Sequence, residues 1–207
     1  MTESLPPPTP VIPSRIEAGR LVLRPYETSD GPALFAAVQE SLLDLAPWLP
    51  WADKHPTVEA STETCARVRT AFDARTDFTM GMFRRDDGRL IGGTGLHRVR
   101  WELPSFEIGY WVRSSDAGRG FVTEAVAALA RTCFESLGAA RVEIFCDPRN
   151  DRSAAVARRV GFVHEGTLRQ RILGVDGRPR DSLAFSLVRQ DWGAMGASIR
   201  ALAGGAA

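Results

Sequence analysis

The alternation of apolar and polar positions predicts a domain that opens with a strand followed by two helices. Residues 20–26 alternate weakly between apolar and polar positions, which is typical of a strand. The next segment has apolar residues at helical spacing, so we expect a helix capped by Ser29 or Asp30 and ending before Pro47. A second helix is expected over residues 57–75.

The remainder of the chain alternates between strand and helix patterns. Two β-rich runs flank Asp86-Asp-Gly88, and a similar pair flanks Val175-Asp-Gly-Arg178, so we expect two hairpins. The predicted elements are a hairpin over 78–97, a strand over 106–113, a helix over 123–137, a strand over 141–146, a helix over 151–160 and a hairpin over 167–189. Residues 15–192 then form a single domain with seven strands. We expect residues 1–14 to be a flexible, proline-rich arm and residues 193–207 to be a frayed tail.

Composition and charge narrow the class of protein. The 207 residues include 26 basic and 25 acidic side chains, and this balance argues against a nucleic-acid partner. The apolar runs are shorter than the ~18 residues of a membrane span, and no secretory signal is visible, so we expect a cytoplasmic protein without a membrane partner. Cys65, Cys133 and Cys146 are far apart, which predicts reduced thiols and no metal site.

One segment has the pattern of an anion site. Gly118-Arg119-Gly120 stands between a predicted strand and the start of a predicted helix, where backbone N–H groups are free to bind a phosphate. Arg113 and Arg119 would add charge-assisted contacts. A glycine-rich turn without a ligand is the alternative. A dinucleotide fingerprint would need a small residue where Thr123 stands, and the antiparallel strands predicted before this turn also argue against it.

Several motifs in one order resemble the GNAT superfamily of acyl-CoA-dependent N-acetyltransferases. The motifs, which lie within residues 15–192, are Glu107-Ile-Gly-Tyr-Trp, Gly118-Arg-Gly-Phe-Val-Thr-Glu-Ala125, Asn150-Asp-Arg-Ser153 and Arg159-Val-Gly-Phe162. Trp48-Leu-Pro-Trp51, Glu165-Gly-Thr-Leu-Arg169 and the segment from Val175 to Trp192 resemble its Rim branch, which acetylates the N-termini of ribosomal proteins.

The resemblance implies a fold and a co-substrate. The fold is α+β: a mixed, mostly antiparallel seven-stranded sheet with helices on both faces and a splayed parallel strand pair that forms an acyl-CoA cleft. The co-substrate is acetyl-CoA, with no metal, and Asn150 would hold the pantetheine arm. The residues expected to contact the coenzyme are Val112, Arg113, Gly118, Arg119, Gly120, Phe121, Val122, Thr123, Asn150 and Ser153.

The catalytic residues implied by the resemblance are Glu107 and Ser153. Glu107 stands where the superfamily often has a general base, although an ion pair with an arginine is the alternative reading. The tyrosine that often protonates the leaving thiolate is replaced here by Ala157, so the role moves to Ser153. The alternative reading of Ser153 is a capping or solvated residue at a helix start. The phosphate loop also departs from the family, because Ala117 replaces the usual Gln or Arg.

The resemblance implies that the acceptor is a primary amine, whose identity the residues leave open. At pH 7 roughly a tenth of α-amines are neutral but only a few lysine amines in ten thousand, so an N-terminal acceptor demands little of a base. The resemblance favours a protein N-terminus that attacks the thioester directly in a ternary complex. A small amine such as a polyamine or aminoglycoside, a non-catalytic acyl-CoA-binding module, and a homodimer stay open. Candidate substrate-binding residues are Trp48, Trp51, His97 and Tyr110.

Overall fold

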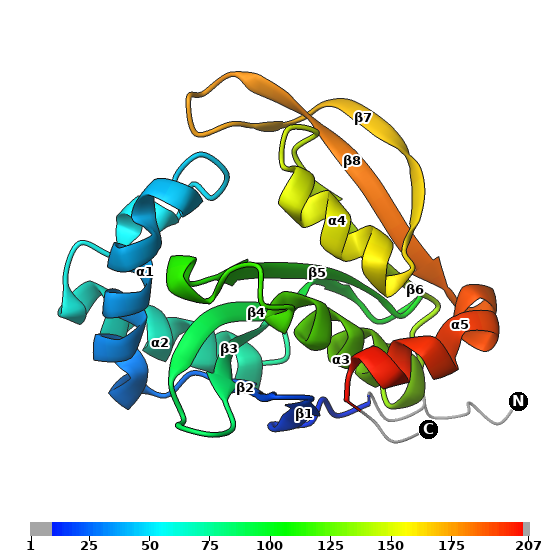
Figure 1. Cartoon of the computed structure of the whole chain (residues 1–207), viewed down its shortest axis with the longest axis horizontal. Coiled ribbons are helices and arrows are strands. Elements are labelled where there is room, and N and C mark those ends of the chain that lie inside the picture. The colour runs from blue at the N-terminus through cyan, green and yellow to red at the C-terminus, as the bar shows by residue number, and fades with distance from the viewer. Residues whose placement is uncertain (1–9, 205–207) are drawn as a thin grey trace, which may run out of the picture.

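The computed structural model describes residues 10–204, which form one mixed sheet of eight strands in the order β1-β2-β3-β4-β5-β6-β8-β7 (Figure 1). Neighbouring strands are antiparallel except β5 and β6, which are parallel. The strands are β1 (Ile16–Ala18), β2 (Leu21–Pro25), β3 (Phe78–Arg84), β4 (Leu90–Arg100), β5 (Ser105–Val112), β6 (Arg141–Cys146), β7 (Val163–Leu173) and β8 (Pro179–Val188).

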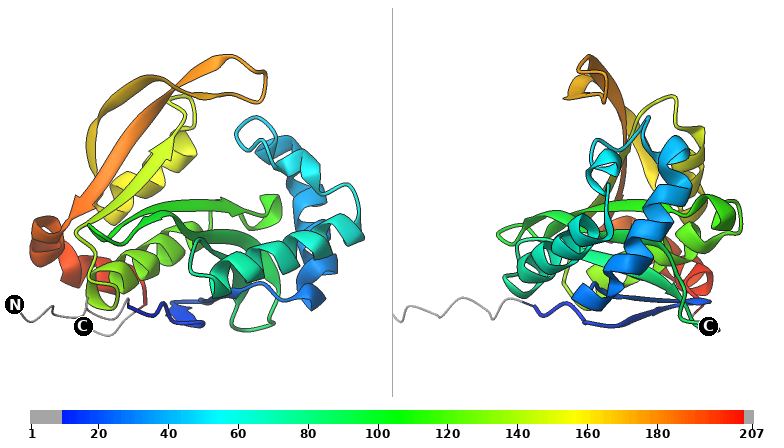
Figure 2. Two further views of the ribbon diagram at one scale, coloured as in Figure 1. Left: turned by 180° about the vertical axis from the view of Figure 1, so that it is seen from behind. Right: turned by 90° about the vertical axis from the view of Figure 1, so that its left-hand side faces the viewer.

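The helices cover both faces of the sheet, as the sequence predicts (Figures 1 and 2). We call the two sides the α1 face, covered by α1 and α2, and the α3 face, covered by α3 and α4. The helices are α1 (Gly31–Leu45), α2 (Val58–Asp73), α3 (Phe121–Glu135), α4 (Asp151–Val160) and α5 (Arg189–Leu202). Single 3-10 turns precede α1, α2 and α3 at Thr28–Asp30, Ala52–Lys54 and Ser114–Asp116. Within residues 10–204, no helix is both long and apolar enough to cross a bilayer.

The two faces are packed differently. On the α3 face, α3 buries most of its side chains in the main apolar core, together with the central strands. On the α1 face a smaller cluster joins Tyr26, Leu34, Val38 and Phe83. The larger apolar cluster therefore includes α3, and Phe72 of α2 also belongs to it, whereas the smaller cluster includes residues of α1 and Cys65 of α2.

Two predictions about the sheet and the C-terminal segment are corrected. The sheet has eight strands because the three residues of β1, which the sequence analysis did not detect, pair with β2. Residues 193–202 are not a frayed tail but the body of α5, in which Trp192 stacks on Phe134 of α3 with ring centroids 5.2 Å apart and Ile199 is buried. Tertiary packing thus orders a segment whose own sequence predicts little structure.

Most of the predicted N-terminal arm lies outside the described residues. Residues 10–14 form neither helix nor strand, but Ile12 is buried in the main core, so this end of the arm is packed against the domain. The expectation of flexibility for residues 1–9 and of fraying for residues 205–207 falls outside the part of the chain that the structure describes.

The parallel strands β5 and β6 separate after three paired positions. Ser105, Phe106 and Glu107 pair with Arg141, Val142 and Glu143, and the register ends there. Strand β6 then pairs along its whole length with β8. The edge of β5 from Ile108 to Val112 is therefore open toward β6, and we call this divergence the fork. The fork confirms the splayed strand pair that the family resemblance implies.

The hairpin β7–β8 extends beyond the rest of the sheet and arches over the fork toward the end of α1 (Figures 1 and 2). Arg180 of β8 donates a hydrogen bond of 2.9 Å to the carbonyl of Pro47, in the loop after α1. The arm formed by β7 and β8 therefore reaches across to the helical side of the molecule.

Candidate active site

The N-terminus of α3 is built as the sequence predicts for an anion site. Gly118 and Gly120 have φ values of +74° and +86°, a region that side-chain-bearing residues rarely adopt. Gly120 is the residue immediately before the helix, so the N–H groups of Phe121, Val122 and Thr123 lie in its first turn without an intrahelical acceptor. This loop, at the end of the fork, has the geometry to hold a phosphate group.

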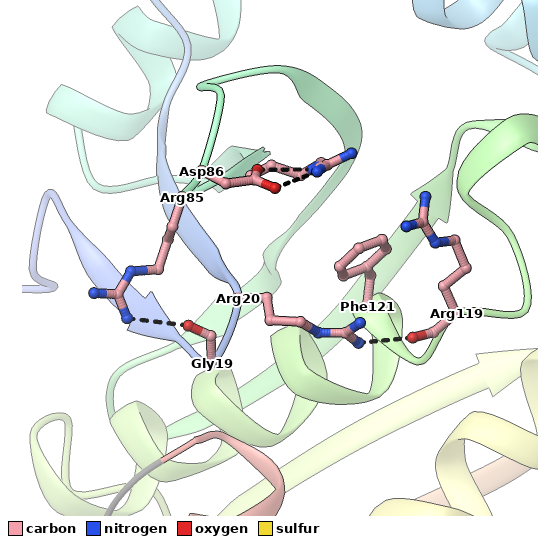
Figure 3. Close-up of a pocket in the computed structure, with 7 residues that line it drawn as sticks. Gly19, Arg20, Arg85, Asp86, Arg119 and Phe121 are labelled. Atoms are coloured by element: carbon pink, nitrogen blue, oxygen red, sulfur yellow. Dashed lines mark hydrogen bonds and ion pairs between the residues drawn. The ribbon is translucent and has the colours of Figure 1, made fainter.

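Arg20 contacts this loop from elsewhere in the chain, and sequence reasoning missed it. Its guanidinium donates to the carbonyl of Arg119 at 2.7 Å and lies over the ring of Phe121 (Figure 3). The same guanidinium pairs with Glu124 at 2.5 Å. These contacts brace the loop from the β1–β2 turn. No local pattern indicates them, because about a hundred residues separate Arg20 from its partners.

A pocket of about 350 Å³ lies beside this loop (Figure 3). It is lined by Gly19, Arg20, Arg84, Arg85, Asp86, Arg119 and Phe121. Arg84 and Arg119 are paired with Asp86 and Asp116 respectively. Arg113, expected to assist Arg119, instead pairs with Glu40 of α1 at 2.7 Å.

On the α3 face of the fork, two hydroxyl groups meet. The hydroxyl of Tyr110 donates to the Ser153 carbonyl at 3.0 Å and lies 3.0 Å from Ser153 Oγ. Asn150 Oδ1 accepts the N–H of Ser153 at 3.0 Å and so caps α4. The predicted pair Asn150 and Ser153 is thus joined by Tyr110, which the sequence analysis placed with the substrate-binding residues.

Burial raises the pKa of Tyr110 above its usual value, although the hydrogen bond with Ser153 opposes this effect. Burial likewise raises the pKa of the neighbouring Cys146 thiol. Both groups therefore keep their protons at neutral pH. A protonated phenol bonded to a serine hydroxyl can pass a proton to a thiolate that forms nearby.

On the α1 face, Glu107 is held in ion pairs. Its Oε2 lies 2.9 Å from Nε of Arg98 and 3.7 Å from an η nitrogen of Arg171, and 19% of its side chain is exposed. Arg171 also lies 3.6 Å above the centroid of Phe145. The structure therefore brings Glu107 to the fork, in the ion-paired state that was the alternative to a general base.

The aromatic residues near the fork fall into two groups. Trp51 packs edge-on against Trp111 of β5 at 5.7 Å and against His55 at 5.8 Å, which ties the loop after α1 to the sheet. Trp48 lies nearer to the arm, with Arg149 6.0 Å from its ring centroid. Trp51 thus serves packing, and Trp48 lies beside the segment between β6 and α4.

His97 lies next to Glu107 in the β4–β5 register. Its Nδ1 is 2.7 Å from Oδ2 of Asp77, and the hydroxyl of Thr79 donates to the other oxygen of Asp77 at 2.5 Å. Burial acts to raise the pKa of Asp77, but the hydrogen bonds from His97 and Thr79 and the charge of His97 lower it below its usual value. No cluster of three or more metal-ligating side chains occurs among residues 10–204.

The sequence profile of the acetyltransferase (GNAT) domain matches residues 20–163, and the chain belongs to this family. RimJ from Mycobacterium smegmatis, solved in complex with CoA-disulfide, is 30% identical, with a TM-score of 0.80 and 92% of each chain covered. A GCN5-related N-acetyltransferase from Brucella melitensis is 26% identical with a TM-score of 0.80, covering 97% of this chain and 90% of that one.

A curated relative also belongs among the ribosomal-protein acetyltransferases. The ribosomal protein uS5-alanine N-acetyltransferase of Escherichia coli is 27% identical over 180 residues, covering 86% of this chain and 92% of that protein. The chain is therefore a GNAT-family N-acetyltransferase with Rim-type homologues.

Proposed function

We propose that the enzyme transfers the acetyl group of acetyl-CoA to the α-amine of a protein N-terminus, by direct attack in a ternary complex. The observation that carries this proposal is the fork, whose open β5 edge has the Tyr110–Ser153 hydroxyl pair on its α3 face and is followed in the chain by the loop at the start of α3. A pantetheine arm has amide groups that can pair with such an edge as an added strand would. The E. coli relative that acts on uS5 supports a protein acceptor.

The coenzyme would lie along the loop and the fork. The α3 N-terminus would hold the pyrophosphate, with Arg119 adding charge and Val112 to Thr123 forming the walls. Asn150 Oδ1 is used by the α4 cap, so its amide nitrogen would contact the pantetheine. Ser153, with Tyr110 behind it, would protonate the departing thiolate. The sulfur would then lie on the α3 face, which leaves the α1 face for the amine.

The charges on the α1 face favour an N-terminal amine over a polyamine. The carboxylates of Glu107 and Glu143 each face basic groups: Glu107 has Arg98 and Arg171, and Glu143 has Arg100 and Arg141. A polycation needs unpaired acidic groups in order to bind, whereas a peptide N-terminus has a single amine. The β7–β8 arm, Trp48 and Trp51 would flank the path of the peptide.

The test is thiol release from acetyl-CoA at steady state with a matched acceptor panel. The panel consists of peptides with free N-termini, the same peptides with a blocked N-terminus and an internal lysine, spermidine, and an aminoglycoside. We expect turnover of the free peptides and at least tenfold lower kcat/KM for the blocked ones. Higher kcat/KM with spermidine or the aminoglycoside than with every free peptide would overturn the proposed acceptor.

A further inference from the structure

His97 is held at one end by an acidic partner, in an arrangement that fixes which ring nitrogen bears a proton. The lowered pKa of Asp77 keeps its carboxylate ionised, and an ionised carboxylate can only accept hydrogen bonds. Nδ1 of His97, 2.7 Å from that carboxylate, is therefore the nitrogen that bears the hydrogen. In the neutral imidazole Nε2 is then the unprotonated nitrogen, with a lone pair available to accept a proton.

The other end of the ring lies over the strand that borders the fork. A Cβ placed on Gly109 of β5 would be 3.0 Å from both Cδ2 and Nε2 of His97, and outside its chain neighbours it would meet no other heavy atom within 4 Å. Gly109 does not have a positive φ, so the backbone does not require glycine there. The missing side chain therefore makes room for the imidazole.

Gly109 also locates Nε2 relative to the open edge of β5. Glu107 is the last residue of β5 that pairs with β6, and Gly109 comes two residues later. Tyr110, the next residue, points to the opposite face and meets Ser153. At residues 109–110 the open edge thus has an imidazole on the α1 face and a pair of hydroxyls on the α3 face.

We propose that His97, oriented by Asp77, is the general base that accepts the proton of the acceptor amine at Nε2. The inference rests on the proposed transfer at the fork. The nitrogen lone pair of the neutral amine forms a bond to the thioester carbon, and the C–S bond breaks. The amine nitrogen loses one proton to Nε2, and the thiolate takes one from Ser153. Proton exchange through water then restores the imidazole and the hydroxyl.

The charged groups around His97 are Asp77, its cross-strand neighbour Glu107, and the guanidiniums of Arg98 and Arg171 that pair with Glu107. Both arginines form ion pairs with Glu107, whereas Nε2 of His97 is the ring nitrogen that does not contact Asp77. About 31% of the His97 side chain is exposed, which leaves it accessible to an incoming amine. In this arrangement the carboxylate of Glu107 balances the charges of Arg98 and Arg171 beside His97.

The variant that tests the proposal is His97→Asn. The Asn amide can still donate to Asp77 but has no group in place of Nε2. We expect kcat/KM for a reactive peptide to fall about 100-fold or more at neutral pH, with KM for acetyl-CoA unchanged. Arg69→Gln is the control, because Arg69 is exposed on α2 in a pair with Asp73, outside the site, and the activity of this variant should equal that of the wild type.

Two positioning variants separate a base from a structural histidine. Gly109→Ala should displace the imidazole ring, and Asp77→Asn should no longer fix the hydrogen of His97 on Nδ1. Each variant should therefore lower kcat about 10-fold or more while the protein stays folded.

A pH profile provides a further test. On the acid side, a plot of log kcat/KM against pH should rise with a slope of about 2 in the wild type, because the base and the amine must both be deprotonated. In His97→Asn the slope should be about 1.

The final experiment reads the tautomer directly. Proton–nitrogen correlation NMR of the wild type, with His97 assigned by comparison with His97→Asn, should show hydrogen on Nδ1 and none on Nε2. A hydrogen on Nε2, or activity of His97→Asn within threefold of the wild type, would overturn the proposal while the acetyltransferase function stands. If the wild type acetylates only small amines, the proposed acceptor fails, and the same variants are then measured with that amine.

Discussion

The two faces of the fork are assembled in different ways. On the α3 face, the loop from Gly118 to Thr123 and the pair Asn150 and Ser153 are two short continuous segments, each at the start of a helix. On the α1 face, Asp77, His97 and Glu107 come from three different strands or loops, and Arg171 comes from the arm. Local motifs thus define the side proposed to bind the coenzyme, whereas the side proposed to bind the acceptor depends on long-range packing.

The largest effect is expected on the α3 face, from Gly120→Val. A β-branched residue at φ +86° is strained by about 1–3 kcal/mol, and its side chain would crowd both Arg20 and a bound phosphate. We expect loss of about 100-fold or more in acetyl-CoA affinity by calorimetry, and loss of the rise in Tm that the coenzyme causes.

Gly138→Val is the matched control, because Gly138 has a φ of +67° after the other end of α3. It should lose similar stability and keep its affinity for the coenzyme. Equal affinities in the wild type and a folded Gly120→Val variant would contradict the phosphate-loop assignment.

The next effect tests the hydroxyl pair on the same face. Ser153→Ala should lower kcat about 10- to 100-fold where chemistry limits the rate, because in the proposed mechanism the serine protonates the thiolate as it leaves. Asn150→Ala, at the N-cap of the same helix, should mainly raise KM for acetyl-CoA. Tyr110→Phe should lower kcat less than Ser153→Ala does, and the double variant should resemble Ser153→Ala, since the two hydroxyls are proposed to act through one hydrogen bond. Effects of Ser153→Ala and Tyr110→Phe that multiply would show that the hydroxyls act separately.

The difference between the faces also explains what could be predicted from the sequence. The strands and helices that border the fork follow from hydrophobic periodicity, and the phosphate loop from glycines at a helix start. Strand β1 is too short to show a period. Helix α5 has glycines at positions 193 and 196 that weaken its own propensity, and the stacking of Trp192 on Phe134 decides its structure.

The contacts of the α1 face have no local signal at all. Asp77 and His97 are 20 residues apart, and Glu107 and Arg171 are farther apart still. Sequence reasoning identified His97 and Glu107 individually but could not decide whether Glu107 is a general base or the ion-pair partner of an arginine. The pairing of Glu107 follows from the register of β4 on β5, which places it beside His97, and from the β7–β8 arm, which brings Arg171 to it.

A smaller effect is expected for Glu107→Gln. Because Arg98 and Arg171 hold this carboxylate, we expect kcat/KM to fall less than tenfold, in a ratio to the wild type that is constant from pH 6 to pH 9. The measurement is a pH profile of both proteins with the same peptide. A loss of about 100-fold or more that is partly rescued at high pH would return the role of general base to Glu107 and take it from His97.

The smallest effect concerns the anchoring of the arm. Glu165 of β7 pairs with Arg141 of β6 and accepts a hydrogen bond from Ser186 of β8 at 2.8 Å. These partners, Arg141 foremost, lower the pKa of Glu165 to about 2. A carboxyl with a lowered pKa stabilises the folded state above its ordinary pKa, and this contribution is lost as the pH falls toward about 2.

Glu165→Gln should therefore reduce the free energy of unfolding at pH 7 by less than about 1 kcal/mol, because 41% of the Glu165 side chain is exposed. Urea denaturation at a series of pH values measures the difference from the wild type, which should shrink as the pH falls from about 4 toward 2. Arg69→Gln, in an exposed pair with Asp73 on α2, is the control and should change stability little at any pH. A difference that grows on acidification would show that Glu165 binds its proton more readily in the folded state, and that apolar contacts rather than charge anchor the arm.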